Sequence, residues 1–160
     1  MCIVMEITLK NFMENTEIKT IVGGVATDDQ GTVRFVNDFD FKDVKRFYQV
    51  QNHSSGFIRA WHGHKKEAKY VYVAKGTALI GAVPLSEIEK GKDAQNVFKT
   101  VVSSNNPKIV YIPSGYANGF KSLEPGTIIQ FFSTSTLQDS LGDDIRFDYD
   151  IVNIWKEDYR

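Results

Sequence analysis

Residues 56–69 read GFIRAWHGHKKEAK and contain two of the chain's three histidines, His62 and His64. On a β-strand, residues two apart share a face, so the two imidazoles should project together. An H-x-H pair alone is a weak indication of a functional site, because exposed histidine pairs are common. The sequence around the pair therefore has to show which fold carries it and what it does.

Short β-like runs continue outward from this stretch in both directions, separated by Gly, Pro or Asn/Asp clusters. This spacing favours a β-sandwich or barrel over a βαβ fold. Only residues 85–95 have a helix-forming composition, and Gly91 limits that helix to a turn or two. The acidic segment 139–150 is expected to pack as a final strand or loop. We expect residues 1–160 to form one all-β domain. The expected strands are 3–9, 19–25, 32–36, 46–50, 57–64, 69–74, 78–83, 97–102, 108–112 and 127–133.

The composition narrows the possible functions. The 19 Lys and Arg residues nearly balance 20 Asp and Glu residues, which argues against a protein built to coat nucleic acid or an anionic membrane. The single cysteine, Cys2, excludes an internal disulfide and a thiolate-rich metal site. The sequence has no apolar run of bilayer length and no signal-peptide pattern at its start, so we expect a cytoplasmic protein with no membrane partner.

The spacing of Gly56, His62-x-His64, Lys69 and Gly76 resembles the first cupin motif, and PSGYAN at 113–118 resembles the second. The resemblance implies a cupin fold, a double-stranded β-helix related to jelly rolls. In metal-binding cupins, however, a carboxylate stands at the position of Lys69 and a histidine at the position of Asn118.

These two replacements argue against a bound metal. A protonated lysine repels a divalent cation and has no lone pair to offer, and an amide oxygen is a poor ligand for iron, nickel or zinc. We therefore expect neither a metal nor another cofactor. A metal-dependent cupin using His62, His64 and Glu67 remains the alternative.

The same residue types suit proton transfer next to a ketone. A histidine of near-neutral pKa can remove a proton from the carbon beside a carbonyl, and a fixed lysine can stabilise the enolate oxygen that develops. Arg59, Lys65 and Lys66 add local positive charge, consistent with a phosphorylated substrate. Alternatively, the two lysines only solvate a turn.

The strings RAWH at 59–62, Lys69 and IPSGYANGF at 112–120 resemble motifs of the dTDP-4-dehydrorhamnose 3,5-epimerase family. NHS at 52–54 and Trp155 resemble further elements of that family. The resemblance implies an isomerase acting on a nucleotide-linked 4-keto sugar, with dTDP as the expected nucleotide, in surface-polysaccharide or lipopolysaccharide assembly. It also implies a homodimer in which N-terminal strands pair between subunits, and the apolar run 2–9 fits such a strand.

The resemblance also implies roles for particular residues. His62 is expected to be the general base, Lys69 the cation that stabilises the enolate, and Arg59 a phosphate contact. Asn118 is expected in the substrate pocket at the position of the epimerase histidine. His53 of the NHS element and Tyr116 of the second motif are expected to contact the substrate. His64 is expected to be a catalytic residue. His64 has its counterpart only in the 3,4-ketoisomerases that act on dTDP-4-keto-6-deoxyglucose, which share the fold.

Three departures from the epimerase pattern leave alternatives open. Phe131 stands where the epimerases carry the tyrosine that reprotonates the opposite sugar face, and Phe has no proton to give. The aspartate that orients the epimerase histidine has only Asp158 as a doubtful substitute. Ala60 replaces a glycine, and strict alternation would put Arg59 and His62 on opposite faces unless the strand is locally irregular.

The missing phenol leaves four candidate replacement acids, Tyr48, Tyr72, Tyr111 and Tyr116. Tyr72 lies an odd number of residues from Lys69 and should face away from it. A 3,4-ketoisomerase would need no opposite acid, because His62 and His64 could move a proton on one face. A non-catalytic sugar-nucleotide-binding cupin is the further alternative.

Overall fold

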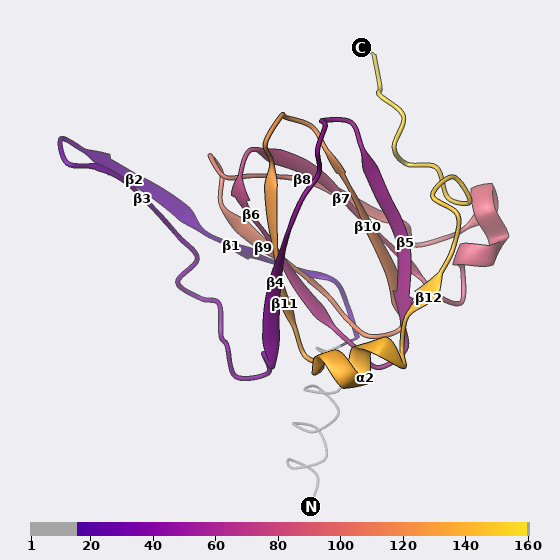
Figure 1. Cartoon of the computed structure of the whole chain (residues 1–160). Helices are drawn as coiled ribbons and strands as arrows, with labels where there is room; N and C mark the ends of the chain where they lie inside the picture. The colour runs from indigo at the N-terminus through magenta and orange to yellow at the C-terminus, as the bar shows by residue number, and fades with distance from the viewer. Residues whose placement is uncertain (1–15, 160) are drawn as a thin grey trace, which may run out of the picture.

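Two antiparallel five-stranded sheets face one another in the computed structural model, which describes residues 16–159 (Figure 1). The first sheet has the strand order β1-β9-β6-β11-β4 and the second has the order β12-β5-β10-β7-β8. A separate two-stranded hairpin, β2–β3, projects from this body. The strands are β1 (Lys19–Val22), β2 (Gly24–Asp28), β3 (Gly31–Phe35), β4 (Arg46–Gln51), β5 (Ile58–His64), β6 (Lys69–Lys75), β7 (Thr77–Pro84), β8 (Phe98–Ser103), β9 (Lys108–Ile112), β10 (Tyr116–Ser122), β11 (Ile128–Ser133) and β12 (Ile145–Arg146).

The all-β prediction is confirmed, and the predicted strands from 32 to 133 occur close to their expected positions, whereas the expected strand 19–25 is divided at Gly23 between β1 and β2, which belong to different sheets. The expected strand at 3–9 lies outside the described residues. Residues 88–93 form a short 3-10 segment in which Gly91 has a φ of 59°, so the predicted short helix is interrupted where the glycine stands. Two elements were not predicted, β10 and the helix α2 (Leu137–Leu141), whereas β12 falls in the segment 139–150 that was expected to pack as a final strand or loop. β10 reads YANGFKS, which lacks β-branched residues and therefore gives little strand signal.

The main core lies between the two sheets. Val71 and Val73 of β6 pack with Ile80 of β7, Phe120 of β10 and Phe131 of β11. Strand residues alternate between faces, so the neighbours of these residues in sequence point outward. A second cluster covers the outer face of the second sheet and is built around two tryptophans, Trp61 and Trp155, whose ring centroids lie 4.9 Å apart.

The predicted irregularity in β5 is confirmed. In the ladder between β5 and β10, Asn118 pairs with His62 but Phe120 pairs with Arg59, so one residue of β10 opposes the two residues 60–61 of β5. Register partners in a ladder project on the same side. The extra residue therefore brings Arg59 and His62 to one face, which strict alternation would have prevented.

The bulge depends on a glycine from the neighbouring strand. Gly119 lies so close to β5 that a Cβ atom built on it would stand 2.4 Å from the Cβ of Ala60, and the peptide bond between Ala60 and Trp61 is cis. No real side chain tolerates that approach. β5 has Ala60 where the family motif has a glycine, and the glycine that permits the close approach is Gly119 on β10.

Candidate active site

The second sheet contributes five of the predicted site residues to its inner face, namely Arg59, His62, His64, Tyr116 and Asn118. His62 pairs with Asn118, and His64 pairs with Tyr116 one step along the same ladder. Asn118 is buried, and its side-chain amide donates a hydrogen bond to the backbone carbonyl of His62 at 3.0 Å. This bond fixes the backbone of the strand at the imidazole that was predicted to be the base.

The first sheet contributes Lys69, which is 6% exposed and extends from the start of β6. Its Nζ lies 2.8 Å from Nε2 of His64 on the opposite sheet. Burial lowers the pKa of Lys69, whereas the nearby carboxylate of Glu67 acts in the opposite direction. The hydrogen bond between Lys69 and His64 joins the two walls of the site, so the two predicted residues do meet.

His62 is half-buried and has a carboxylate beside one ring nitrogen. Its Nδ1 lies 3.7 Å from Oδ1 of Asp144, and Asp144 is itself held by the guanidinium of Arg146, at 2.8 Å from Nε and 2.7 Å from Nη2. Arg146 is the register partner of His62 in the β12–β5 ladder. Burial, with a contribution from Arg146, lowers the pKa of His62 to about 4, although Asp144 acts to raise it. The imidazole is therefore neutral at pH 7 and able to accept a proton.

Asp144 was not among the residues predicted for the site. The sequence argument placed the orienting carboxylate near the C-terminus, where Asp158 was the available candidate. Asp158 instead lines a groove with Lys121 and Trp155, beside the apolar cluster on the outer face of the second sheet. The acidic run 139–150 was the signal that could have identified Asp144.

His64 differs from His62 in that both of its ring nitrogens face groups of the wall. Nε2 bonds Lys69, and Nδ1 lies 3.2 Å from Oε2 of Glu67, at an angle too poor for a hydrogen bond. A carboxylate can only accept a hydrogen and an ammonium can only donate one. The neutral tautomer with its hydrogen on Nδ1 therefore suits both neighbours, and burial also lowers the pKa of His64.

Glu67 is the centre of a buried polar group that we call the Glu67 cluster, comprising Glu67, His64, Lys69, Arg46, Ser133 and Ser140. The two serine hydroxyls each donate to the carboxylate at 2.6 Å, and Nη2 of Arg46 lies 3.4 Å from it. Burial alone would raise the pKa of Glu67, but Lys69 and the two serine hydroxyls outweigh burial and hold the pKa below its usual range. Glu67 is thus a buried, ionised and fully partnered carboxylate.

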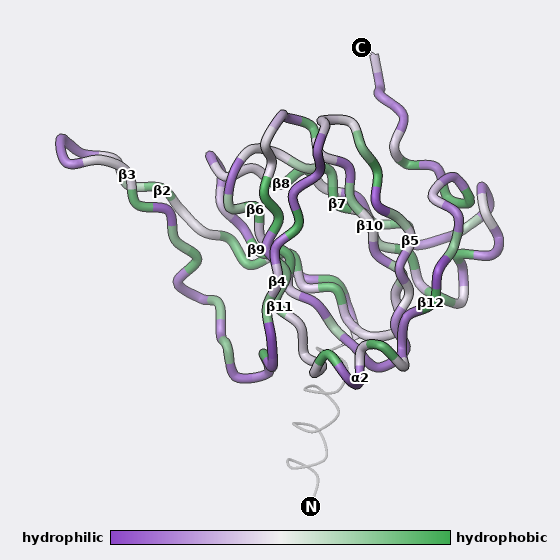
Figure 2. Tube along the Cα trace, viewed as in Figure 1, coloured by the Kyte–Doolittle hydropathy of each residue, from purple (hydrophilic) through white to green (hydrophobic). Residues whose placement is uncertain are grey.

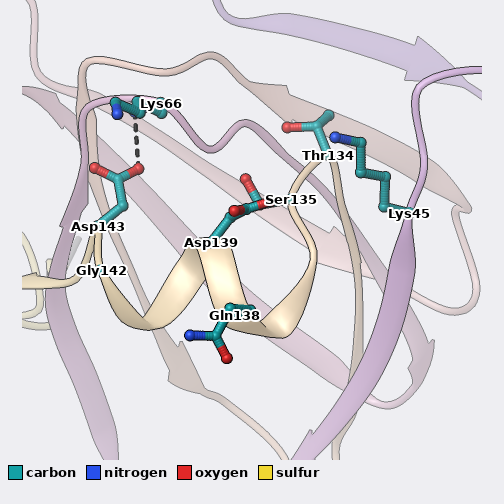
Figure 3. Close-up of a pocket in the computed structure, with 8 residues that line it drawn as sticks. All are labelled: Lys45, Lys66, Thr134, Ser135, Gln138, Asp139, Gly142 and Asp143. Carbon is teal, nitrogen blue, oxygen red and sulfur yellow. Dashed lines mark hydrogen bonds between the residues drawn. The ribbon is translucent and has the colours of Figure 1, made fainter.

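A second carboxylate fixes the turn that carries Glu67. Asp143 accepts the backbone N–H groups of Lys65, Lys66 and Glu67 at 2.8, 2.8 and 2.9 Å. The side chains of Lys65 and Lys66 are exposed. Outside this turn, against α2, is a hollow of about 530 Å³ bordered by Lys45, Lys66 and Asp143 (Figure 3). None of the predicted catalytic residues lines this hollow.

Arg59, the predicted phosphate contact, is exposed, and a buried asparagine holds its guanidinium. Its Nε donates to Oδ1 of Asn52 at 3.0 Å, and the buried amide of Asn52 donates to Ser122 at 3.1 Å. His53 follows Asn52 and is exposed in the turn before β5. Of the NHS element, then, the asparagine is the residue that touches Arg59.

The four candidate acids divide between the two faces. Tyr72 lines an outer groove with Phe39, and Tyr111 packs on Tyr70, so these two point away from the site. Tyr48 pairs with the inward-facing Phe131 and shares its face. Tyr116 is on the inner face as well, but beside His64 on the second sheet.

The described residues do not assemble a metal centre. Within residues 16–159, no group of three or more His, Cys, Asp and Glu side chains is arranged to hold a metal ion. Nζ of Lys69 lies 4.0 Å from Oε1 of Glu67, so a cation already stands beside this carboxylate. In the same range, no helix has the length and apolar character that crossing a bilayer requires.

Comparisons with known proteins agree with this fold. The family described as dTDP-4-dehydrorhamnose 3,5-epimerase matches residues 17–158. The spore coat polysaccharide biosynthesis protein SpsL of Bacillus subtilis is 28% identical over 141 residues, which are 84% of this chain and 91% of that protein.

Solved structures give the fold. The 3'-monoepimerase ChmJ of Streptomyces bikiniensis, in complex with dTDP-quinovose, is similar with a TM-score of 0.71 and 16% identity over 89% of this chain and 77% of that one. A 3,4-ketoisomerase from Helicobacter canadensis has a TM-score of 0.62 and 16% identity over 84% of this chain and 93% of that one. The predicted cupin fold is confirmed.

Fold and site together define a cupin-type isomerase. The chain belongs to the dTDP-4-dehydrorhamnose 3,5-epimerase family and is an epimerase or isomerase of dTDP-linked sugars. This confirms the class of enzyme predicted from the sequence.

Proposed function

We propose that the protein is a metal-independent epimerase of the 3,5-epimerase type that acts on a dTDP-linked 4-keto-6-deoxyhexose. One observation carries the proposal: His62, neutral and half-exposed, has Asp144 at its Nδ1, while Lys69 stands on the opposite wall. Among the described residues no hydrogen bond from another side chain reaches Nε2 of His62. That nitrogen is the one available to a substrate.

The proposed reaction begins with proton abstraction beside the ketone. Nε2 of His62 removes the proton, and Asp144 stabilises the imidazolium that forms. The electrons of the broken C–H bond move into a C=C bond, and the carbonyl oxygen becomes an enolate facing Lys69. The ammonium of Lys69 has three hydrogens, one of which bonds His64, so two remain for that oxygen.

The engagement of His64 favours epimerisation over ketoisomerisation. A one-face shuttle between neighbouring carbons would need His62 and His64 to exchange protons with the substrate in turn. His64 is 3% exposed, and its two nitrogens face Lys69 and Glu67. We therefore assign His64 a positioning role toward Lys69 in place of the catalytic role predicted from the sequence.

The remaining predicted residues are proposed as substrate contacts. Arg59 is exposed and pre-oriented by Asn52, which suits a guanidinium that receives a diphosphate. Asn118 and Tyr116 lie on the inner face beside the two histidines, and His53 lies next to Asn52 at the turn. The dTDP-quinovose bound by ChmJ supports a dTDP-linked substrate, and the role named for SpsL supports a place in polysaccharide biosynthesis.

The test is incubation with dTDP-4-keto-6-deoxyglucose in deuterated water. Deuterium at C3 or C5 together with an epimerised product supports the proposal. His62→Asn should lower exchange by about 1,000-fold, within the range expected for removal of a general base, while the melting temperature is unchanged. Lys69→Met should slow exchange and leave dTDP binding intact. Lys75→Met, at the exposed far end of the same strand, is the matched control and should behave as wild type.

The alternatives have different outcomes in the same experiment. Movement of the keto group to C3 without inversion would make the protein a ketoisomerase and contradict the epimerase assignment. Binding of the nucleotide sugar with neither exchange nor product would leave only the non-catalytic binding cupin.

We also propose that the protein is a homodimer, assembled through the β2–β3 hairpin. The hairpin pairs with no other strand of the described chain and exposes Val25, Val33 and Phe35. Its base is apolar, whereas its tip is hydrophilic (Figure 2). An isolated two-stranded hairpin is marginal in water, so a second copy is the expected support. Residues 2–9, predicted to pair between subunits, lie outside the described residues.

Light scattering tests the assembly. The wild type should have the mass of a dimer, and Val33→Asp should give a monomer of unchanged β content. A monomeric wild type at micromolar concentration would contradict the proposal.

A further inference from the structure

The phenol that the family pattern places at position 131 has a neighbour with the same group. Phe131 on β11 pairs across the ladder with Tyr48 on β4. The two rings are stacked, with centroids 5.1 Å apart and an interplanar angle of 10°. The inner face of the first sheet therefore still carries a phenol, displaced by one strand from the expected position.

Tyr48 lies among the charged groups of the site. The Cζ atom of Arg46 is 4.9 Å from its ring centroid, and Nζ of Lys69 is 6.0 Å from it. Two members of the Glu67 cluster therefore lie beside the ring, and the charges of Glu67 and Asp144 also act on the phenol. The ring is partly buried, so it is neither a core residue nor a free surface residue.

The two sheets supply opposite sides of the space between them. His62 belongs to the second sheet and Tyr48 to the first. Epimerisation requires a proton to leave from one face of the sugar and another to arrive on the opposite face. A base on one wall and an acid on the other is the arrangement that this inversion needs.

The other three candidate tyrosines do not satisfy this requirement. Tyr72 and Tyr111 point outward from the first sheet. Tyr116 is on the same sheet as His62 and pairs with His64, so it approaches from the side of the base. Tyr48 is the candidate that combines the inner face with the wall opposite His62.

We propose that Tyr48 is the proton donor that returns hydrogen to the sugar face opposite His62. The inference rests on the proposed epimerase function and deepens it. As the enolate collapses, the C=O bond re-forms and the C=C electrons take the proton of the Tyr48 hydroxyl, leaving a phenolate. His62 then releases its proton to water and the phenolate takes one from water, so the cycle returns both groups to their starting forms.

Burial, followed by the charge of Glu67, raises the pKa of Tyr48 to about 12, so the phenol is protonated at pH 7, as a proton donor must be. The cations of Arg46 and Lys69 near the ring would stabilise the phenolate when it forms. Stacking on Phe131 fixes the plane of the ring.

The decisive experiment moves the hydroxyl between the two stacked rings. Tyr48→Phe removes only the hydroxyl and keeps the stack. With dTDP-4-keto-6-deoxyglucose in deuterated water, this variant should retain exchange within about threefold of wild type and lose about 100-fold in epimer formation, since abstraction by His62 survives while return on the opposite face fails. The double variant Tyr48→Phe, Phe131→Tyr should recover at least about tenfold of the lost product formation, because the phenol returns one strand away on the same wall.

The single variant Phe131→Tyr carries a phenol at both positions. It is the control for the introduced hydroxyl and should form the epimer. Melting temperatures and dTDP binding of all three variants exclude loss of the fold. Epimer formation by Tyr48→Phe at the wild-type rate would overturn the assignment, and so would a loss of exchange equal to the loss of product. Failure of the proposed function itself is distinguishable, because the wild type would then show neither exchange nor product.

Discussion

The site contains two polar groups, the His62–Asp144 pair and the Glu67 cluster, and they are built in different ways. In the cluster the carboxylate is buried, accepts two serine hydroxyls and faces three cationic or imidazole side chains. In the pair the imidazole and the carboxylate are each 28% exposed and lie 3.7 Å apart. A buried hydrogen-bonded network rigidifies a structure, whereas a group with a spare ring nitrogen and access to solvent can react.

The two histidines show that a buried network and a reactive pair can lie side by side on one strand. His62 and His64 share a strand and a face, yet His64 is 3% exposed and spans to Lys69, while His62 lies beside the short strand β12. The difference comes from their partners on other strands. An H-x-H motif therefore does not mean two equivalent catalytic histidines.

The largest expected effect comes from breaking the cluster. Glu67→Gln keeps the shape and removes the charge, which leaves Arg46 and Lys69 without their buried counter-ion. Breaking a buried pair on one side costs about 3–5 kcal/mol. For a chain of this size, 3 kcal/mol corresponds to a fall of roughly 6–12 °C in melting temperature. Calorimetry on the purified variant measures it.

Asp144→Asn is the matched comparison for that experiment, since it removes a carboxylate from the exposed pair. Its melting temperature should stay within about 2 °C of wild type, because exposed ion pairs contribute little. Equal destabilisation by both variants would contradict the division into a structural and a reactive group.

A second prediction concerns the bulge that brings Arg59 and His62 to one face. Gly119→Ala would place a Cβ atom 2.4 Å from the Cβ of Ala60, so β5 has to move. Overpacking of this kind typically costs about 1–3 kcal/mol. The displacement falls between the base and the phosphate contact, and kcat/KM should therefore fall by about 10–100-fold, as expected for misplacement of reacting groups. Gly126→Ala, at a turn away from the site, is the control; wild-type kcat/KM for Gly119→Ala would show that the bulge does not set the geometry.

Much of the fold could be predicted because turn residues and apolar runs are local signals. The strands from 69 to 83 and from 97 to 112 are rich in Val, Ile and Tyr and are bounded by Gly or Asn-Pro. β10 was missed because YANGFKS is held by its two neighbours rather than by its own propensity. β12 has two residues and exists only by pairing with β5.

The site was predictable where a motif carries it and not where the fold assembles it. Motif spacing placed His62, Lys69 and Asn118 in one site. The partners that give these residues their chemistry come from distant segments: Asp144 lies 82 positions after His62, and Tyr48 reaches the site by pairing with Phe131. Such contacts depend on strand register across the two sheets, which local patterns do not encode.

Asp144→Asn should also lower catalysis by a smaller factor than loss of the base. The amide no longer stabilises the imidazolium, so kcat should fall by about tenfold to a hundredfold while KM changes little. Because the carboxylate raises the pKa of His62, its removal should move the acid limb of kcat/KM to lower pH. A purely structural Asp144 would lower kcat without moving the limb.

Replacing Arg146 should have the smallest effect on kcat/KM at pH 7. At low pH it should shift the acid limb in the direction opposite to that of Asp144→Asn. Its guanidinium lowers the pKa of His62, so Arg146→Gln should move the acid limb of kcat/KM upward from its wild-type midpoint near pH 4. At pH 7 the imidazole stays deprotonated in both proteins, and the rates there should agree within about threefold. The profile is measured from pH 3.5 to 7 with circular dichroism at each point to confirm the fold. If Arg146→Gln and Asp144→Asn moved the limb in the same direction, the two charges would not act on His62 as the structure places them.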